Sequence, residues 1–63
     1  MMDIMEKIKE KVNEESKDIE EYMDMAEAAE HKGMHKEAMV FKDIAHDEMS
    51  HMKYLSEITN KVQ

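Results

Sequence analysis

The sequence predicts an all-α fold, an antiparallel two-helix hairpin that pairs with a second copy into a four-helix bundle. The 63 residues contain no proline and a single glycine, Gly33. Apolar residues recur at intervals of three and four on either side of that glycine, as expected for amphipathic helices. A hairpin of this size buries little apolar surface, so self-association or a bound metal is expected to complete its core.

The first helix is expected over about residues 3–30. At helical spacing its apolar stripe comprises Ile4, Ile8, Val12, Ile19, Tyr22, Ala26 and Ala29. One carboxylate, that of Glu15, falls on the same face. A helix of about 28 residues would be roughly 42 Å long.

The turn is expected at about residues 31–34. Glycine enters the left-handed backbone region without penalty, so Gly33 predicts a helix C-terminal cap. The second helix should then run over about 35–61, although no Ser, Thr, Asn or Asp offers it an N-cap. Its apolar stripe comprises Phe41, Ile44, Ala45, Met52, Leu55, Ile58 and Val62. With so short a connection, residues 1–63 form a single antiparallel hairpin domain.

Composition excludes several functions. A net charge of -7 argues against nucleic acid and anionic membranes as partners. The chain has no cysteine, which rules out disulfides, thiolate zinc sites and iron–sulfur ligands. No apolar run approaches a membrane span, and the first residues lack a signal-peptide layout. The expected location is the cytoplasm.

Glu48 and His51 interrupt the stripe of the second helix. They lie one turn apart and therefore share a face. A charged carboxylate in a core is costly unless it is paired or binds a metal. Two chains would bring together four glutamates and two histidines, the ligand set of dinuclear carboxylate proteins. We therefore expect Glu15, Glu48 and His51 to bind two iron ions per homodimer, with manganese or zinc also suited to these donors.

The Glu-x-x-His pattern by itself is weakly specific. Asp43 and His46 have the same spacing, but His46 lies about 200° round the helix from Glu48 and should face solvent. Glu20 and Glu21 are other acids of the first helix, and both lie off its apolar stripe. The placement of Glu15 and Glu48 on apolar faces is what makes the prediction sharper.

The stretch from Glu15 to Leu55 resembles one helical hairpin of the rubrerythrin branch of the ferritin-like superfamily. The matching residues are Glu15, Tyr22, Gly33, Ala38, Phe41, Ile44, Ala45, Glu48, His51 and Leu55. The resemblance implies a ferritin-like bundle, with Glu48 as a bridging carboxylate, Glu15 as a terminal or bridging one, and His51 as a terminal nitrogen ligand. It also implies a role for Tyr22 beside the ligands, hydrogen-bonded to a carboxylate or close to the oxidant. The implied reaction is oxidation of Fe(II) by dioxygen or peroxide.

The chain departs from that family in three ways. Its members usually carry four helices in one chain, so a second copy must complete the site here. Rubrerythrins also have a cysteine-ligated iron domain, so peroxidase turnover by this chain would need an external electron donor. Many place a further acidic ligand three residues after the first glutamate, where this sequence has the shorter Asp18.

Other interpretations remain open. Glu15 could be protonated or paired with a lysine such as Lys53, and the Glu48–His51 pair could only set helix register. Tyr22 could be a core aromatic residue. The histidines at the turn, His31 and His35, could bind a surface metal. At the level of function, the alternatives are a non-catalytic metal-binding module and a metal-free helical dimer.

Overall fold

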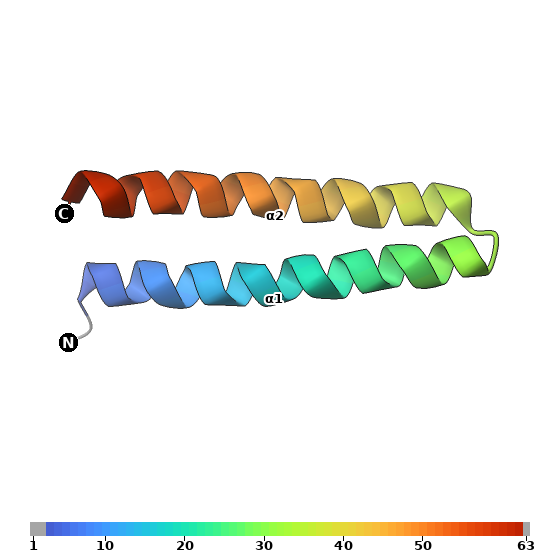
Figure 1. The fold of residues 1–63 in the computed structure, drawn as a ribbon, viewed down its shortest axis with the longest axis horizontal. Coiled ribbons are helices and arrows are strands. Elements are labelled where there is room, and N and C mark those ends of the chain that lie inside the picture. Colours follow the sequence, from blue (N-terminus) through green and yellow to red (C-terminus); the bar gives the residue numbers. More distant parts are fainter. Residues whose placement is uncertain (1–2, 63) are drawn as a thin grey trace.

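A computed structural model describes residues 3–62 and the side chains of residues 3–60. Helix α1 runs over Ile4–His31 and helix α2 over His35–Val62. Figure 1 shows the two lying side by side and antiparallel, which confirms the all-α hairpin. Met1, Met2 and Gln63 of the expected domain, and the side chain of Val62 from the expected stripe, lie outside the described residues.

Helix α1 begins after Asp3, whose backbone is extended at φ -63° and ψ 142°. The Asp3 carboxylate accepts a hydrogen bond of 3.3 Å from the backbone N–H of Met5. Such an N-cap satisfies one of the donors that the first helical turn leaves free. The first expected helix residue is therefore the cap rather than part of the helix.

The turn follows from the backbone freedom of Gly33, whose φ is +75°. Its N–H donates to the carbonyl of Glu30 at 3.0 Å, and the N–H of Met34 donates to that of Ala29 at 2.9 Å. This hydrogen-bond pair is the Schellman motif, which closes a helix with a left-handed residue. Helix α2 starts directly after it, with the N–H of Ala38 bonded to the Met34 carbonyl at 3.0 Å.

Small side chains separate the helices near the turn. The buried residues are Ile8, Ala26, Ala29, Ala38 and Ala45. All four alanines lie in the half of the hairpin that carries the turn, where they allow the backbones to approach closely. Figure 1 shows the helices nearer to each other at the turn than at the open end.

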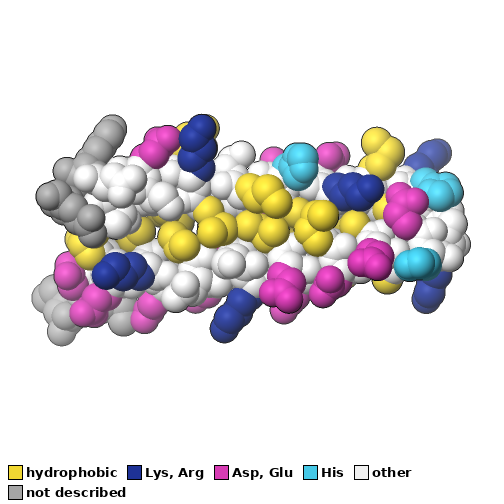
Figure 2. Space-filling model, viewed as in Figure 1, with side chains coloured by type: hydrophobic (Ala, Val, Ile, Leu, Met, Phe, Trp, Pro, Cys, Tyr) yellow, Lys and Arg dark blue, Asp and Glu magenta, His cyan; other side chains and the backbone are white. Residues whose placement is uncertain are grey.

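Among its described residues the hairpin has no large side chain that is fully buried. Its extents are 46 × 20 × 12 Å, so it is one helix thick. A single layer leaves most side chains larger than alanine open on at least one face, and domains normally need two packed layers. Much of the expected stripe is consequently half-buried, and Ile4 and Ile58 are exposed. Figure 2 shows hydrophobic side chains along the line where the helices meet, with charged side chains on both sides.

Neither helix, over the residues described, is long and apolar enough to cross a membrane.

Candidate metal centre

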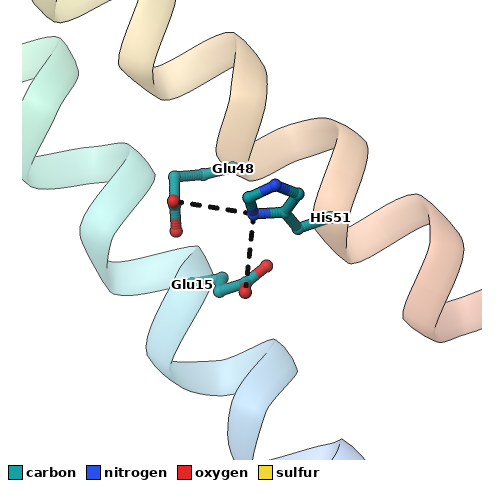
Figure 3. A group of neighbouring side chains, drawn as sticks. All are labelled: Glu15, Glu48 and His51. Carbon is teal, nitrogen blue, oxygen red and sulfur yellow. Dashed lines mark ion pairs between the residues drawn. The ribbon is translucent and has the colours of Figure 1, made fainter.

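Three predicted ligands converge near the middle of the hairpin. Glu15 comes from α1, and Glu48 and His51 come from successive turns of α2 (Figure 3). The Nδ1 atom of His51 lies 3.9 Å from Oε1 of Glu15 and 3.7 Å from Oε1 of Glu48. One ligand atom from each residue lies within 4.8 Å of the other two. We refer to these three residues as the trio.

The two carboxylates of the trio are largely buried, although the imidazole is not. The side chains of Glu15 and Glu48 are 15% and 21% exposed, whereas that of His51 is 55% exposed. The Oε2 atom of Glu15 is buried and has no hydrogen-bond partner. A buried oxygen of this kind loses its hydration without compensation, at a cost of about 1–3 kcal/mol or more for a charged group.

The spacing of the trio is too wide for hydrogen bonds, which join nitrogen and oxygen at about 2.7–3.2 Å. Atoms that share a divalent transition metal at about 2.0–2.2 Å are separated by about 3–4 Å. The distances from His51 Nδ1 to the two oxygens fall in that interval. Two carboxylate oxygens and an imidazole nitrogen also form a donor set suited to iron, manganese or zinc. The residues present therefore fit a metal ion.

A lysine does not neutralise the trio. Over the side chains described, Glu15 and Glu48 form ion pairs only with His51. Lys11, one turn before Glu15 on α1, pairs instead with Glu14 at 3.4 Å. Within residues 3–60, therefore, no lysine forms the ion pair with Glu15 that the alternative interpretation requires.

Tyr22 lies two helical turns from Glu15, toward the hairpin turn. Its ring stacks on that of Phe41, with centroids 6.5 Å apart and an interplanar angle of 28°. No hydrogen bond joins its hydroxyl to the trio within the described hairpin. The expected role of Tyr22 beside the ligands therefore stays a prediction. Asp18, one turn from Glu15, is half-buried.

The other histidines are exposed. His31 pairs with Glu27 at 3.8 Å, and Nδ1 of His35 lies 2.8 Å from an oxygen of Glu30. Each ring thus has its own carboxylate, and residues 3–60 contain no further group of three ligands close enough to share an ion. His46 faces solvent, as do the acids expected to lie off the stripe, Glu20 and Glu21.

The sequence did not indicate which ring nitrogen would point into the site. Nδ1 of His51 faces both carboxylates, and the second nitrogen points away from them (Figure 3). The direction depends on side-chain rotation, which residue spacing does not determine.

The chain matches no protein-family model, no curated protein and no solved structure. The similarity of Glu15–Leu55 to rubrerythrins accordingly remains an expectation from its residues.

Proposed function

We propose that the chain is a dinuclear metal carboxylate protein that oxidises Fe(II), with its site between two copies of the hairpin. Two observations carry this proposal: the trio converges on one place, and the second oxygen of Glu15, Oε2, is buried with no hydrogen-bond partner among the described residues. Evolutionary relatives lend it no support, so it depends on the chemistry of these side chains.

Charge balance favours two ions for two chains. Each trio contributes two carboxylates, so two copies bring a formal charge of -4 and two imidazoles. Two ferrous ions would neutralise that charge, and coordination would compensate the desolvation of the glutamates. With one ligand atom from each residue, a single trio provides three ligands. An octahedral site, which hard divalent ions such as manganese prefer, needs six. The second copy supplies the remaining protein ligands.

An apolar surface beside the trio supports self-association. On α2, the side of His51 carries Val40, Ile44, Leu55 and Ile58, which lie 11, 7, 4 and 7 residues from it. We call this side of the hairpin the site face. Val40 and Ile58 are exposed, although both are large and apolar. Pairing of two site faces would cover these side chains and the half-exposed imidazole together, which gives the hairpin its missing second layer.

In this proposal Fe(II) is the substrate. Two ferrous ions supply the two electrons that reduce dioxygen to hydrogen peroxide, or hydrogen peroxide to two waters. Either reaction takes up two protons. Glu15 and Glu48 bind the cations and balance their charge, which rises by one for each ion oxidised. The Nδ1 atom of His51 provides a nitrogen ligand.

The proposal is tested by anaerobic Fe(II) titration of chelator-treated protein, followed by exposure to air. We expect saturation at about one iron per chain and ferric absorbance after air is admitted, with both lost in Glu48→Ala. Glu20→Gln is the matched control, because it removes an exposed acid of α1 that lies away from the trio. Binding without oxidation would instead favour a structural metal site, for which zinc and manganese are the competing ions. Absence of binding at micromolar protein would refute the metal function and leave a metal-free helical dimer.

A further inference from the structure

We infer that the side of the hairpin facing away from the trio docks a basic amphipathic helix of another protein. The helix would lie in the trough between α1 and α2, with its apolar residues on exposed methionines and its cationic residues toward the acids near the turn. This surface requires neither a metal ion nor the proposed dimer, so the inference stands apart from the proposed function.

The position of Lys42 defines this side of the hairpin. Lys42 precedes His51 by nine residues, which at about 100° for each residue places the two on opposite sides of α2. Met49 follows Lys42 by seven residues and therefore lies within about 20° of it. From α1, Met23 and Glu27 line one groove together with Lys42. We call the side that carries Met23, Glu27, Lys42 and Met49 the rear face. Pairing of two site faces leaves it uncovered.

A shallow trough runs along the rear face between the helices. Near the turn it forms a groove of about 330 Å³, in which Met23 lies beside buried Ala26. Toward the open end a second groove, of about 350 Å³, is lined by Val12 of α1 and Ser56 of α2. Lys42 and Ser56, one in each groove, are 14 residues apart, or about 21 Å along α2. Figure 2 shows hydrophobic side chains along the line where the helices meet on this face. A trough of this length matches a helix of about four turns.

Methionine supplies most of the exposed apolar surface of the hairpin. Among the side chains of residues 3–60, five of seven methionines are exposed, against three of nine isoleucine, leucine, valine and phenylalanine residues. The branched and aromatic side chains thus occupy the contact between the helices, while thioethers face outward. Methionine is unbranched and polarisable, so a surface built from it adapts to the side chains of a docking helix. On the rear face this surface consists of Met23 and Met49, and covering them removes apolar area from water.

Charge selects a basic partner. Residues 18–47 contain nine acids and three lysines, a formal net charge of -6, and the rest of the chain adds only -1. Asp24, Glu27 and Glu30 line the groove near the turn, where Lys42 is the one lysine. Within residues 3–60, none of these three acids forms an ion pair with a lysine. A neutral or anionic helix would leave their charge uncompensated, so complementarity of charge favours a partner rich in lysine and arginine.

These features specify the pattern of the docked helix. Met23 and Lys42 line the same groove, and Met49 lies about 10 Å further along α2. Two apolar residues seven positions apart on a helix have the same separation and share one face. Lysine or arginine at the end nearer the turn would meet the acids of the groove, with the methylene groups of its side chain packed on Met23.

The probe for this surface is a fluorescein-labelled helical peptide of about 15 residues, with leucines three, four and seven positions apart on one face and lysine elsewhere. We expect fluorescence anisotropy to show saturable binding to the full chain in the micromolar range. Met23→Ser should weaken binding about tenfold, and Met23→Leu, which keeps the apolar surface, should not. Met25→Ser is the matched control, because Met25 is 44% exposed and Met23 41%, and the two lie about 160° apart on α1. Circular dichroism verifies that each variant is folded.

The acids are tested in the same way. Glu27→Gln should weaken binding and reduce its dependence on salt, whereas exposed Glu21→Gln, about 120° away on α1, should change neither. A peptide of the same composition with its leucines scrambled, or with glutamate in place of lysine, should bind at least about tenfold more weakly.

Several outcomes would overturn the inference. Absence of saturable binding, equal binding of the scrambled peptide, or equal losses in Met23→Ser and Met25→Ser would each do so. Weaker binding to Glu48→Gln would place the peptide on the site face instead. Assemblies larger than a dimer that Met23→Ser dissolves would assign the rear face to further copies of the chain. None of these results bears on metal binding by the trio, so failure here leaves the proposed function standing.

Discussion

Replacing Glu48 by glutamine should have opposite effects on the metal-free and the metal-loaded protein. The substitution keeps the size of the side chain, removes its charge and replaces one acceptor oxygen by an NH2 donor. In the metal-free state it eliminates the repulsion between Glu48 and Glu15, whose nearest ligand oxygens lie within 4.8 Å. In the metal-loaded state it removes an anionic ligand. We therefore expect Glu48→Gln to raise the unfolding free energy of the metal-free protein and to weaken metal binding.

The expected magnitude follows from the separation of the charges. Two unit charges no more than 4.8 Å apart interact with at least about 1 kcal/mol in water and at least about 3.5 kcal/mol at an effective dielectric of 20. Both carboxylates are largely buried but lie beside a half-exposed imidazole, so we expect a gain between these two values, about 1–3 kcal/mol. The attraction between Glu48 and His51 opposes this gain weakly, because the imidazole is 55% exposed and the pair is screened.

Urea denaturation followed by circular dichroism, with and without zinc, measures both effects. A zinc concentration 100 times the dissociation constant should stabilise the unsubstituted protein by about 2.7 kcal/mol and the variant by much less. Glu20→Gln should change neither quantity. The reasoning fails if Glu48→Gln destabilises the metal-free protein and leaves zinc stabilisation unchanged, since that pattern would indicate a structural Glu48–His51 pair.

Three further changes test the hairpin and the site. Gly33→Ala should lower the free energy of unfolding, measured by urea denaturation, by about 1 kcal/mol. The cost comes from the backbone, because φ at this position is +75° while no atom lies within 4 Å of the added Cβ. A change below about 0.3 kcal/mol would contradict the need for a left-handed residue in the turn. Ala45→Leu should lower the free energy of unfolding by about 1–3 kcal/mol and weaken zinc binding, because a larger side chain at this fully buried position separates the helices one turn before Glu48. Met39→Leu, at an exposed position, is the control. A zinc titration of Ala45→Leu that matches the unsubstituted protein would refute the link between packing and metal binding. Tyr22→Phe keeps the stacking on Phe41, so stability should change by less than about 0.5 kcal/mol while stopped-flow Fe(II) oxidation slows by about tenfold. An unchanged oxidation rate would make Tyr22 a packing residue only.

Much of the hairpin could be predicted from local patterns. The three- and four-residue spacing places Glu15, Glu48 and His51 on helix faces that must meet when the turn at Gly33 closes. These are local properties, determined largely by neighbouring residues in the chain: the positive φ of Gly33, the two runs without proline and the helical spacing of apolar residues. The prediction that these three side chains converge needed no further information, because helical rise and a short turn leave little choice of register.

Other features could not be derived from spacing. The stripe was expected to be buried, yet Ile4 and Ile58 are exposed, because two helices form only one layer. The alanines nearer the turn suggest that the helices approach closely there, but the widening of the hairpin toward its open end depends on how opposing side chains pack. The different exposures of Glu15 and His51 depend on the same contacts.

The sequence by itself determined two helices, the turn between them and the three candidate metal ligands, Glu15, Glu48 and His51. These properties depend on residue type and on intervals along one chain. Only the tertiary structure decided that Nδ1 of His51 faces both carboxylates and that one oxygen of Glu15 is buried without a partner. Both results depend on the distance and rotation of one helix relative to the other, which are determined by the packing of side chains from opposite halves of the sequence.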